Sequence, residues 1–152
     1  RLLGDRLQQV LVNGARSGLT TAVLFVDLDN FKTLNDTRGH EVGDLLLKDV
    51  AQRLRSGVRD ADVVARLGGD EFALLQRGVS DGDSAYRLAD RLVQALGQPT
   101  EIEAHALQIG ASIGIVLSPG DGTEAEELLR KADSAMYLAK ATGRGCARIY
   151  GT

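Results

Sequence analysis

The apolar run at residues 22–26 constrains the fold more than any other part of the chain. Its sequence, Ala-Val-Leu-Phe-Val, lies within the β-rich stretch 20–28 and shows no alternation of polar and apolar side chains. A strand with hydrophobic side chains on both faces is stable when both faces are covered, as in the middle of a sheet packed between helices. The run therefore predicts a central, buried strand.

Helical and strand patterns alternate along the rest of the chain. Apolar residues at helical spacing, such as Val42, Leu46 and Val50, predict amphipathic helices. The predicted helices cover residues 2–15, 29–35, 41–58, 84–96 and 123–141. Further strands are predicted at residues 63–67, 71–75, 101–102, 107–117 and 147–150. Because hairpins are mixed with strand–helix alternation, the order predicts an α/β (α+β) protein with a mixed sheet covered by helices.

The last predicted helix carries signals at both ends. Thr123 and Glu126 have the spacing of a capping box, in which the threonine side chain satisfies a free N–H group of the first turn. Gly143 follows the end of the pattern, where glycine commonly stops a helix. We therefore expect Thr123 to cap this helix.

Composition narrows the functional classes. The 152 residues suit one domain, and the net charge of −3 offers no excess of positive charge for nucleic acid. No apolar stretch approaches the ~20 residues of a membrane helix, and the single cysteine, Cys146, cannot form an internal disulfide. We expect a cytoplasmic domain that contacts neither nucleic acid nor membrane. Since the chain starts at Arg1 and not at Met, we expect a piece of a longer protein.

A carboxylate stands at the end of the predicted central strand. Asp27 directly follows the apolar run, where an ionised side chain is costly unless it is solvated, paired or bound to a metal. Asp29 comes two residues later, so both side chains point to one side if the strand continues. Taken alone, the pair is explained more simply: Asp27 ends the strand and Asp29 caps the next helix.

A second pair of acids follows a glycine-rich turn. In the Gly-Gly-Asp-Glu-Phe stretch at residues 68–72, the glycines tighten the turn and let a ligand approach the backbone. If this predicted hairpin lies beside residues 20–28, Asp27 and Asp70 meet. Two carboxylates with open positions suit Mg²⁺, which prefers a few acids together with substrate phosphates. Such a site supports nucleotidyl transfer.

Four blocks of this sequence resemble the GGDEF family, the diguanylate cyclases. The first is the 68–72 stretch, preceded by Arg66-Leu67. The others are Phe-Val-Asp-Leu-Asp-Asn-Phe-Lys at 25–32, Asn-Asp-Thr-Arg-Gly-His at 35–40 followed by Gly-Asp at 43–44, and Ala-Asp at 132–133 with Tyr-Leu-Ala-Lys-Ala-Thr-Gly-Arg at 137–144. Four blocks in the family's order, spanning nearly the whole chain, are far more specific than one short motif. One departure is Gly145, where the family commonly has Asn.

The resemblance implies a fold and a metal site. The expected fold is a mixed central sheet of five to six strands flanked by helices, similar to nucleotidyl cyclase and polymerase palm domains. Mg²⁺ or Mn²⁺ would be held by Asp27, the Leu28 carbonyl oxygen and Asp70, with support from Glu71. Asp70 would also accept the proton of the attacking 3′-hydroxyl.

The resemblance also implies residues that bind the phosphates. Lys32 would neutralise charge on the triphosphate, and Lys140 with Arg144 would grip phosphates from the end of the last helix. Each has a simpler explanation from the residues alone: Lys32 as a solvated surface lysine, and the other two as cations that interact with the carboxyl end of a helix.

Guanine recognition is implied for Asn35 and Asp44. A carboxylate accepts hydrogen bonds from the N1–H and the amino group of guanine, a donor pair that adenine lacks, so Asp44 should reject ATP. Without the resemblance, Asp44 is an acid in the first turn of a helix, where it is favourable in any case. The other residues expected to contact GTP are Phe31, His40, Gly68 and Gly69.

Arg-Asp-Ala-Asp at residues 59–62 has the position of the family's product-inhibition site. On its own this stretch is a polar loop between a helix and a strand. The resemblance favours binding of cyclic di-GMP by Arg59 and Asp62, with Arg91 as a secondary contact.

The implied function is a diguanylate cyclase that condenses two GTP into cyclic di-GMP and two pyrophosphates. Each domain would hold one GTP, so the reaction would require a homodimer. An upstream sensor domain and a downstream phosphodiesterase domain are possible neighbours in the full protein. The alternative is a non-catalytic regulatory module that binds GTP or cyclic di-GMP.

Overall fold

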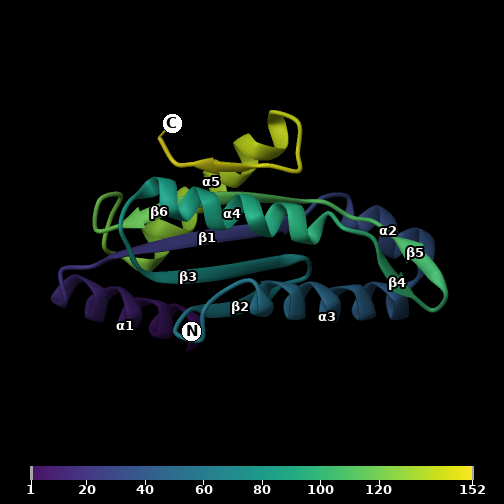
Figure 1. Cartoon of the computed structure of the whole chain (residues 1–152), viewed down its shortest axis with the longest axis horizontal. Coiled ribbons are helices and arrows are strands. Elements are labelled where there is room, and N and C mark those ends of the chain that lie inside the picture. The colour runs from purple at the N-terminus through teal and green to yellow at the C-terminus, as the bar shows by residue number, and fades with distance from the viewer. Residues whose placement is uncertain (1, 152) are drawn as a thin grey trace.

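The computed structural model describes residues 2–151 and arranges them around one mixed sheet (Figure 1). The helices are α1 (Leu2–Arg16), α2 (Phe31–Arg38), α3 (His40–Ser56), α4 (Gly82–Leu96) and α5 (Ala125–Ala141). The strands are β1 (Thr20–Leu28), β2 (Val63–Gly68), β3 (Glu71–Val79), β4 (Thr100–Ile102), β5 (His105–Leu107), β6 (Ala111–Ser118) and β7 (Ala147–Ile149). Five strands form the main sheet in the order β2-β3-β1-β6-β7, and β4 pairs with β5 in a separate hairpin. Within residues 2–151, no helix has the length and apolar content needed to cross a membrane.

β1 is the central strand of the main sheet. It pairs antiparallel with β3 on one side and with β6 on the other, and β6 in turn carries the parallel edge strand β7. Val23, Leu24 and Val26 of β1 are fully shielded from solvent. The prediction of a central strand buried on both faces is confirmed, as is the mixed sheet flanked by helices.

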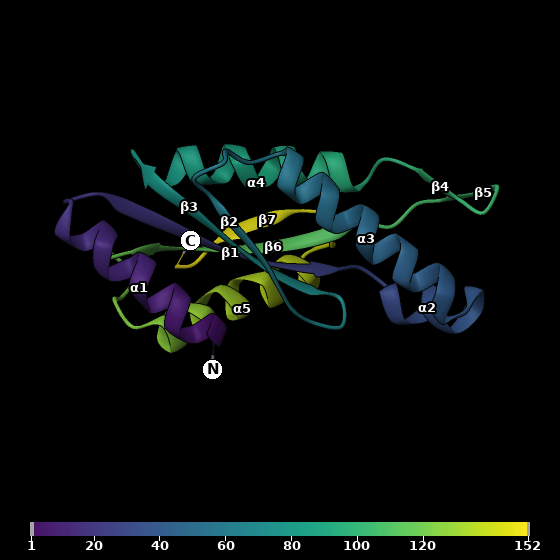
Figure 2. The same ribbon diagram turned by 90° about the horizontal axis from the view of Figure 1, so that it is seen from below.

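Helices cover both faces of this sheet, as the view from below shows (Figure 2). α3 and α4 lie on one face, in the same core as Leu24 and Val26 of β1. α1 and α5 lie on the other face, in a second core that includes Val23 and Phe25. Because side chains alternate along a strand, neighbouring residues of β1 enter different cores.

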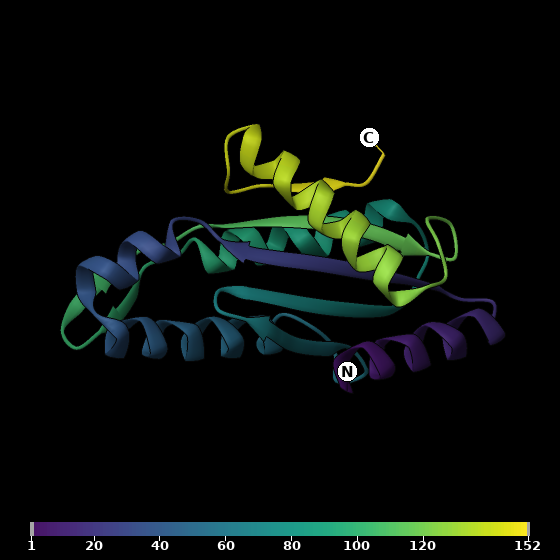
Figure 3. The same ribbon diagram turned by 180° about the vertical axis from the view of Figure 1, so that it is seen from behind.

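α5 crosses the sheet at close range over β6 (Figure 3). Gly114 of β6 permits this approach: a Cβ atom at this position would collide with the α5 backbone at Ala132 and Met136. The close packing fixes the end of α5, and with it Lys140, relative to the end of β1.

The predicted strand 107–117 is wrong in one respect, because the structure divides it. Leu107 ends β5, which pairs with β4, and the main-sheet strand β6 begins only at Ala111. Between them, the carbonyl oxygen of Gly110 accepts a hydrogen bond from the N–H of Asp29 at 2.8 Å. The chain at Gly110 is thus bonded to the residue that follows β1.

The predicted capping box at the start of α5 is also wrong. α5 begins at Ala125, and no side chain of its own caps it. Gln8 of α1 does so instead: its Oε1 accepts from the N–H of Ala125 at 2.8 Å, and its Nε2 donates to the carbonyl oxygen of Thr123 at 3.0 Å. A side chain from the neighbouring helix supplies the acceptor that the local sequence was expected to supply.

Candidate active site

The end of β1 lies beside the turn that joins β2 and β3. In the antiparallel register Asp27 is opposite Glu71, the residue after Asp70. The N–H of Leu28 donates to the carbonyl oxygen of Asp70 at 3.2 Å. The structure therefore brings Asp27 and Asp70, which are far apart in the sequence, to one place.

The glycines of the turn adopt backbone conformations that favour glycine. Gly68 has φ 152° and Gly69 has φ 48°, and a Cβ atom added at either would meet only open space. Nε of Arg66 donates to the carbonyl oxygen of Gly69 at 3.0 Å and closes the turn. The turn leaves its backbone open to a ligand.

The carboxyl group of Asp27 is the most perturbed group of the site. Burial raises its pKa from the usual 3.8 to about 7; the charge of Asp70 and a proton shared with that neighbour act in the same direction. Lys140 opposes this change by lowering the pKa. The pKa of Glu71 is also raised, by burial and then by the charges of Asp70 and Asp133. Negative charge is thus concentrated where a cation would relieve it.

The acids at this site fit a divalent cation. Oδ1 of Asp27 is buried, and no hydrogen-bond donor within residues 2–151 reaches it. The same residues contain no group of three or more His, Cys, Asp or Glu side chains that could hold a metal by themselves. A pair of carboxylates that leaves most positions to other ligands is the arrangement Mg²⁺ prefers when it binds with substrate phosphates.

Lys140 joins the site from the end of α5. Its Nζ lies 3.7 Å from Oδ2 of Asp27 and 3.2 Å from Oδ1 of Asp29. Its side chain is 20% exposed. Arg144, the expected second phosphate-binding cation, is exposed in the loop after α5 with a φ of 62°. The structure thus brings Lys140 to the acids and leaves Arg144 in solvent.

The expected guanine-binding residues form a second group where α2 meets α3. Nδ2 of Asn35 and Nδ1 of His40 are 2.8 Å apart, at hydrogen-bond distance. Gly43 of α3 is buried here, and a Cβ atom on it would collide with the Asn35 side chain and contact the ring of Phe31. Gly43 was not among the predicted site residues. Its signal was a glycine inside a helix, which costs about 1 kcal/mol relative to alanine and therefore needs a reason.

Lys32 and Asp44 flank this second group in solvent. Both are exposed, and neither side chain makes a hydrogen bond or ion pair with any residue from 2 to 151. Lys32 lies in the first turn of α2, which follows β1 directly, and Asp44 is next to Gly43 in α3. Both side chains are therefore available to a ligand.

Asp62 of the predicted inhibitory site is buried in a hydrogen-bonded turn. Its carboxylate accepts from the N–H of Arg59 at 3.0 Å, from the N–H of Arg77 at 3.3 Å and from the Arg59 guanidinium at 3.1 Å. The Asp62 side chain is 2% exposed and that of Arg59 59% exposed. Arg91 is exposed on α4, and its neighbour Leu92 packs against the Gly57 position just before this turn. Arg59 is thus accessible to a ligand, whereas Asp62 is held by the fold.

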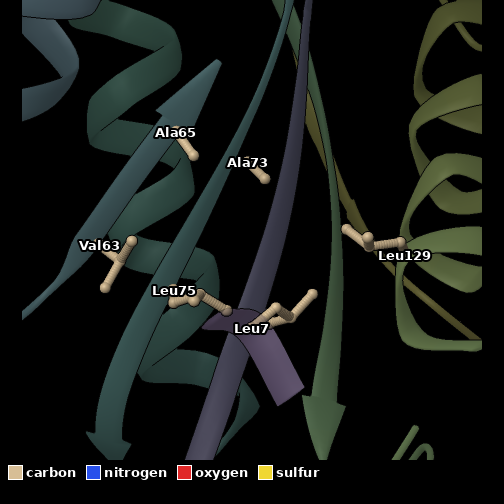
Figure 4. Close-up of a pocket in the computed structure, with 6 residues that line it drawn as sticks. All are labelled: Leu7, Val63, Ala65, Ala73, Leu75 and Leu129. Atoms are coloured by element: carbon tan, nitrogen blue, oxygen red, sulfur yellow. The ribbon is translucent and has the colours of Figure 1, made fainter. Parts of the chain in front are cut away.

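An apolar pocket lies elsewhere, between α1, the β2–β3 hairpin and α5 (Figure 4). Six hydrocarbon side chains line it: Leu7, Val63, Ala65, Ala73, Leu75 and Leu129. It offers no side-chain group for a phosphate or a cation. This pocket therefore lacks the polar groups that the candidate site has at the end of β1.

Asp29 does not occupy the helix-cap position that was first expected for it. The cap position of α2 is Asn30, whose side chain makes no capping hydrogen bond, and Asp29 is 6% exposed. Its carboxylate accepts hydrogen bonds from Ser112, Lys140 and the N–H of Gly145. The interpretation of Asp29 as a helix cap is wrong, whereas its predicted orientation towards the Asp27 side is consistent with the shared contact to Lys140.

The sheet order and the acids at adjoining strand ends define a palm-like nucleotidyl cyclase fold. A family profile described as "Diguanylate cyclase, GGDEF domain" matches residues 1–146. The chain belongs to the GGDEF family.

The similar proteins have names that give either one activity or two. The chain is 52% identical over 143 residues to the bifunctional diguanylate cyclase/cyclic di-GMP phosphodiesterase MucR of Pseudomonas aeruginosa, covering 94% of this chain and 21% of MucR. It is 44% identical over 142 residues to the cyclic di-GMP phosphodiesterase NbdA of the same organism, covering 93% of this chain and 18% of NbdA. The chain therefore spans about a fifth of the length of these relatives.

A solved structure has the same fold over almost the whole chain. The crystal structure of the GGDEF domain of TpbB (YfiN) from Pseudomonas aeruginosa matches with a TM-score of 0.94 and 38% sequence identity. The match covers 99% of this chain and 94% of that one.

Proposed function

We propose that this domain condenses two GTP molecules into cyclic di-GMP. In each of two steps, the 3′-hydroxyl oxygen of one GTP bonds to the α-phosphorus of the other. The bond between the α- and β-phosphates breaks, and pyrophosphate leaves with the bonding electrons. The hydroxyl proton passes to a carboxylate, for which Asp70 is the candidate.

One observation carries this proposal: the carboxylates of Asp27, at the end of β1, and of Asp70, in the open glycine turn before β3, lie beside each other, and Asp27 has a buried oxygen without a donor among residues 2–151. Asp27, the Leu28 carbonyl and Asp70 are the candidates to hold Mg²⁺ or Mn²⁺, with Glu71 beside them. A cation held by these groups would neutralise the negative charge that develops on the phosphates during transfer. Burial at this site strengthens the attraction between the acids and a cation.

The surrounding residues suit the two ends of GTP. Lys32, Lys140 and Arg144 are the candidate cations for the phosphates. The guanine would lie at the junction of α2 and α3, where Asp44 is free to accept from its N1–H and amino group. Asn35, with Phe31 and His40 beside it, would form the remaining wall, and the turn at Gly68 and Gly69 would admit the phosphates.

A homodimer is part of the proposal. One domain holds one GTP in this assignment, so the two halves of the reaction need two domains face to face. Cyclic di-GMP would then also act as an inhibitor through Arg59, with Arg91 nearby. In a longer chain we expect an upstream sensor domain, a possible downstream phosphodiesterase domain and a cytoplasmic position.

The test is to incubate the purified domain with GTP and Mg²⁺ and to separate the products by chromatography. The unmodified chain is expected to release cyclic di-GMP and two pyrophosphates per product. Asp70→Ala should lose this activity at least a thousandfold, whereas Asp83→Ala, an exposed acid in α4, should keep it. If the unmodified chain dimerises and binds GTP without forming product, the proposed activity is wrong.

The second candidate is a regulatory module that binds nucleotide without turnover. It is favoured by NbdA, whose name gives only a phosphodiesterase activity although it is 44% identical to this chain. Calorimetry distinguishes the two functions. Saturable binding of GTP with no release of pyrophosphate indicates the module, and steady release indicates the enzyme.

A further inference from the structure

We propose that Asp29 is a positioning residue for the phosphate-binding lysine. Its carboxylate binds the Lys140 ammonium and keeps it from pairing closely with Asp27. The ammonium thus remains available to the triphosphate, and the Asp27 carboxylate to the cation. This inference rests on the proposed function, because it concerns the same site.

The contacts of Asp29 come from three separate segments. Its Oδ1 accepts from Oγ of Ser112 in β6 at 2.7 Å and from Nζ of Lys140 in α5 at 3.2 Å. Its Oδ2 accepts from the N–H of Gly145, in the loop before β7, at 3.0 Å. Both oxygens are therefore satisfied, and the side chain is only 7% exposed. A buried carboxylate with this set of donors is a fixed anchor.

Asp27 holds the same lysine less closely. Nζ of Lys140 is 3.7 Å from Oδ2 of Asp27, beyond ordinary hydrogen-bond distance, whereas it is within hydrogen-bond distance of Asp29. Oδ1 of Asp27 has no donor among residues 2–151. The geometry thus separates the two carboxylates: Asp29 is occupied by protein groups, and Asp27 retains free acceptor capacity.

Removal of the Asp29 charge would change which carboxylate pairs with Lys140. A largely buried ammonium needs a nearby negative charge. With a neutral residue at position 29, Asp27 is the remaining carboxylate within 4 Å of the Lys140 ammonium among residues 2–151. Pairing of these two would occupy the candidate cation ligand and draw the ammonium away from the triphosphate.

Two glycines shape the space around Asp29. A Cβ atom at Gly110 would lie 3.0 Å from its Oδ2, tighter than ordinary contact. Gly145 has φ 57°, a left-handed conformation that glycine and asparagine tolerate better than other residues. Glycine at position 145 therefore tolerates the backbone conformation in which its N–H reaches Asp29.

A double-mutant cycle on nucleotide affinity tests the proposal. The probe is the non-reactive α,β-methylene analogue of GTP with Mg²⁺, titrated in a calorimeter. Asp29→Asn is expected to weaken binding about tenfold, from the loss of one charged hydrogen bond, and Lys140→Met by at least as much. Because Asp29 acts through Lys140, the double variant should bind like Lys140→Met alone. Asp121→Asn, which alters a carboxylate bonded to the N–H of Leu117 at the other end of β6, should leave the affinity unchanged.

Additive losses in the double variant, or unchanged affinity in Asp29→Asn, would overturn the proposal. If Asp29→Asn does not fold, NMR of the unmodified protein gives a second test. The ammonium protons of Lys140 should exchange slowly with water, unlike those of the exposed Lys32; equally fast exchange contradicts the proposal. The analogue cannot react, so absence of cyclic di-GMP from GTP refutes the cyclase without affecting this test.

Discussion

The ammonium of Lys140 lies 3.7 Å from Oδ2 of Asp27, although the two residues are near opposite ends of the chain. The crossing of α5 over β6 makes this contact possible, and β1 presents Asp27 at its end. Lys140 lowers the pKa of Asp27, but burial and Asp70 raise it by more, to about 7. Without a metal, Asp27 therefore titrates near neutral pH.

This pKa predicts how stability depends on pH in the metal-free protein. The folded state keeps the Asp27 proton up to about pH 7, whereas the unfolded chain releases it near 3.8. Between these values the folded state binds more protons, so the free energy of unfolding falls as pH rises. One pKa unit corresponds to about 1.4 kcal/mol, and the total loss should reach a few kcal/mol. Urea unfolding from pH 4 to 8, with a chelator present, measures it.

Asp27→Asn provides the control for this titration. An amide does not ionise, so the decline of stability with pH should become shallower in the variant. Mg²⁺ should stabilise the unmodified protein more at pH 8 than at pH 5, since protons and cation compete for one carboxylate. An equally steep decline in Asp27→Asn would show that other groups cause it.

Asp44 should determine the choice between GTP and ATP. Its exposed carboxylate has no partner within residues 2–151, so a guanine can take both of its oxygens. Asp44→Ala should reduce the ratio of kcat/KM for GTP over ATP at least tenfold. Glu41→Ala changes an exposed acid in the first turn of the same helix and should leave this ratio unchanged. A ratio that stays constant in Asp44→Ala would remove Asp44 from base recognition.

Arg59→Ala should relieve product inhibition with a small loss of stability. The Asp62 carboxylate keeps two backbone donors after this change, so the cost should be about 1 kcal/mol. The concentration of cyclic di-GMP that halves the initial rate should rise at least tenfold, and Arg87→Ala on α4 should not alter it. Inhibition that persists in Arg59→Ala places the inhibitory site elsewhere.

Gly114→Ala should destabilise the whole domain. A methyl group there collides with the backbone of α5, which cannot move without disturbing the core beneath it. The free energy of unfolding should fall by about 3 kcal/mol or more. Gly120→Ala adds the same methyl group in open space and should change stability by under about 1 kcal/mol. Denaturant unfolding of the two variants compares these effects directly, and equal losses would refute the close packing.

The sequence allowed the strand and the hairpin of the candidate site to be predicted, whereas their pairing was only a condition. The unbroken apolar run before Asp27 could belong only to a strand covered on both sides, and the Gly-Gly turn before Asp70 marked a hairpin. If the hairpin lay beside that strand, the two acids had to meet, and the register of β1 with β3 places them so.

Contacts between distant segments were beyond prediction from local patterns. Asp29 resembled a helix cap because its partners, Ser112 and Gly145, are more than eighty residues away. Gln8 gave no local sign that it would cap α5, since that bond depends on how two helices pack. Spacing reports which side chains share a face of one element, but it does not report what packs against that face.

Because the register between β1 and β3 positions the acids, the site depends on the number of residues in the hairpin as well as on their identity. Successive side chains of a strand face opposite ways, so one residue inserted between Phe72 and Ala73 would turn Glu71 to the other face of the sheet while the Gly-Gly-Asp-Glu-Phe stretch stayed intact. A domain of this type would therefore lose the proposed activity through a single inserted residue. The presence of the motif is therefore not enough to identify an active domain. The number of residues between the motif and the rest of β3 must also be conserved.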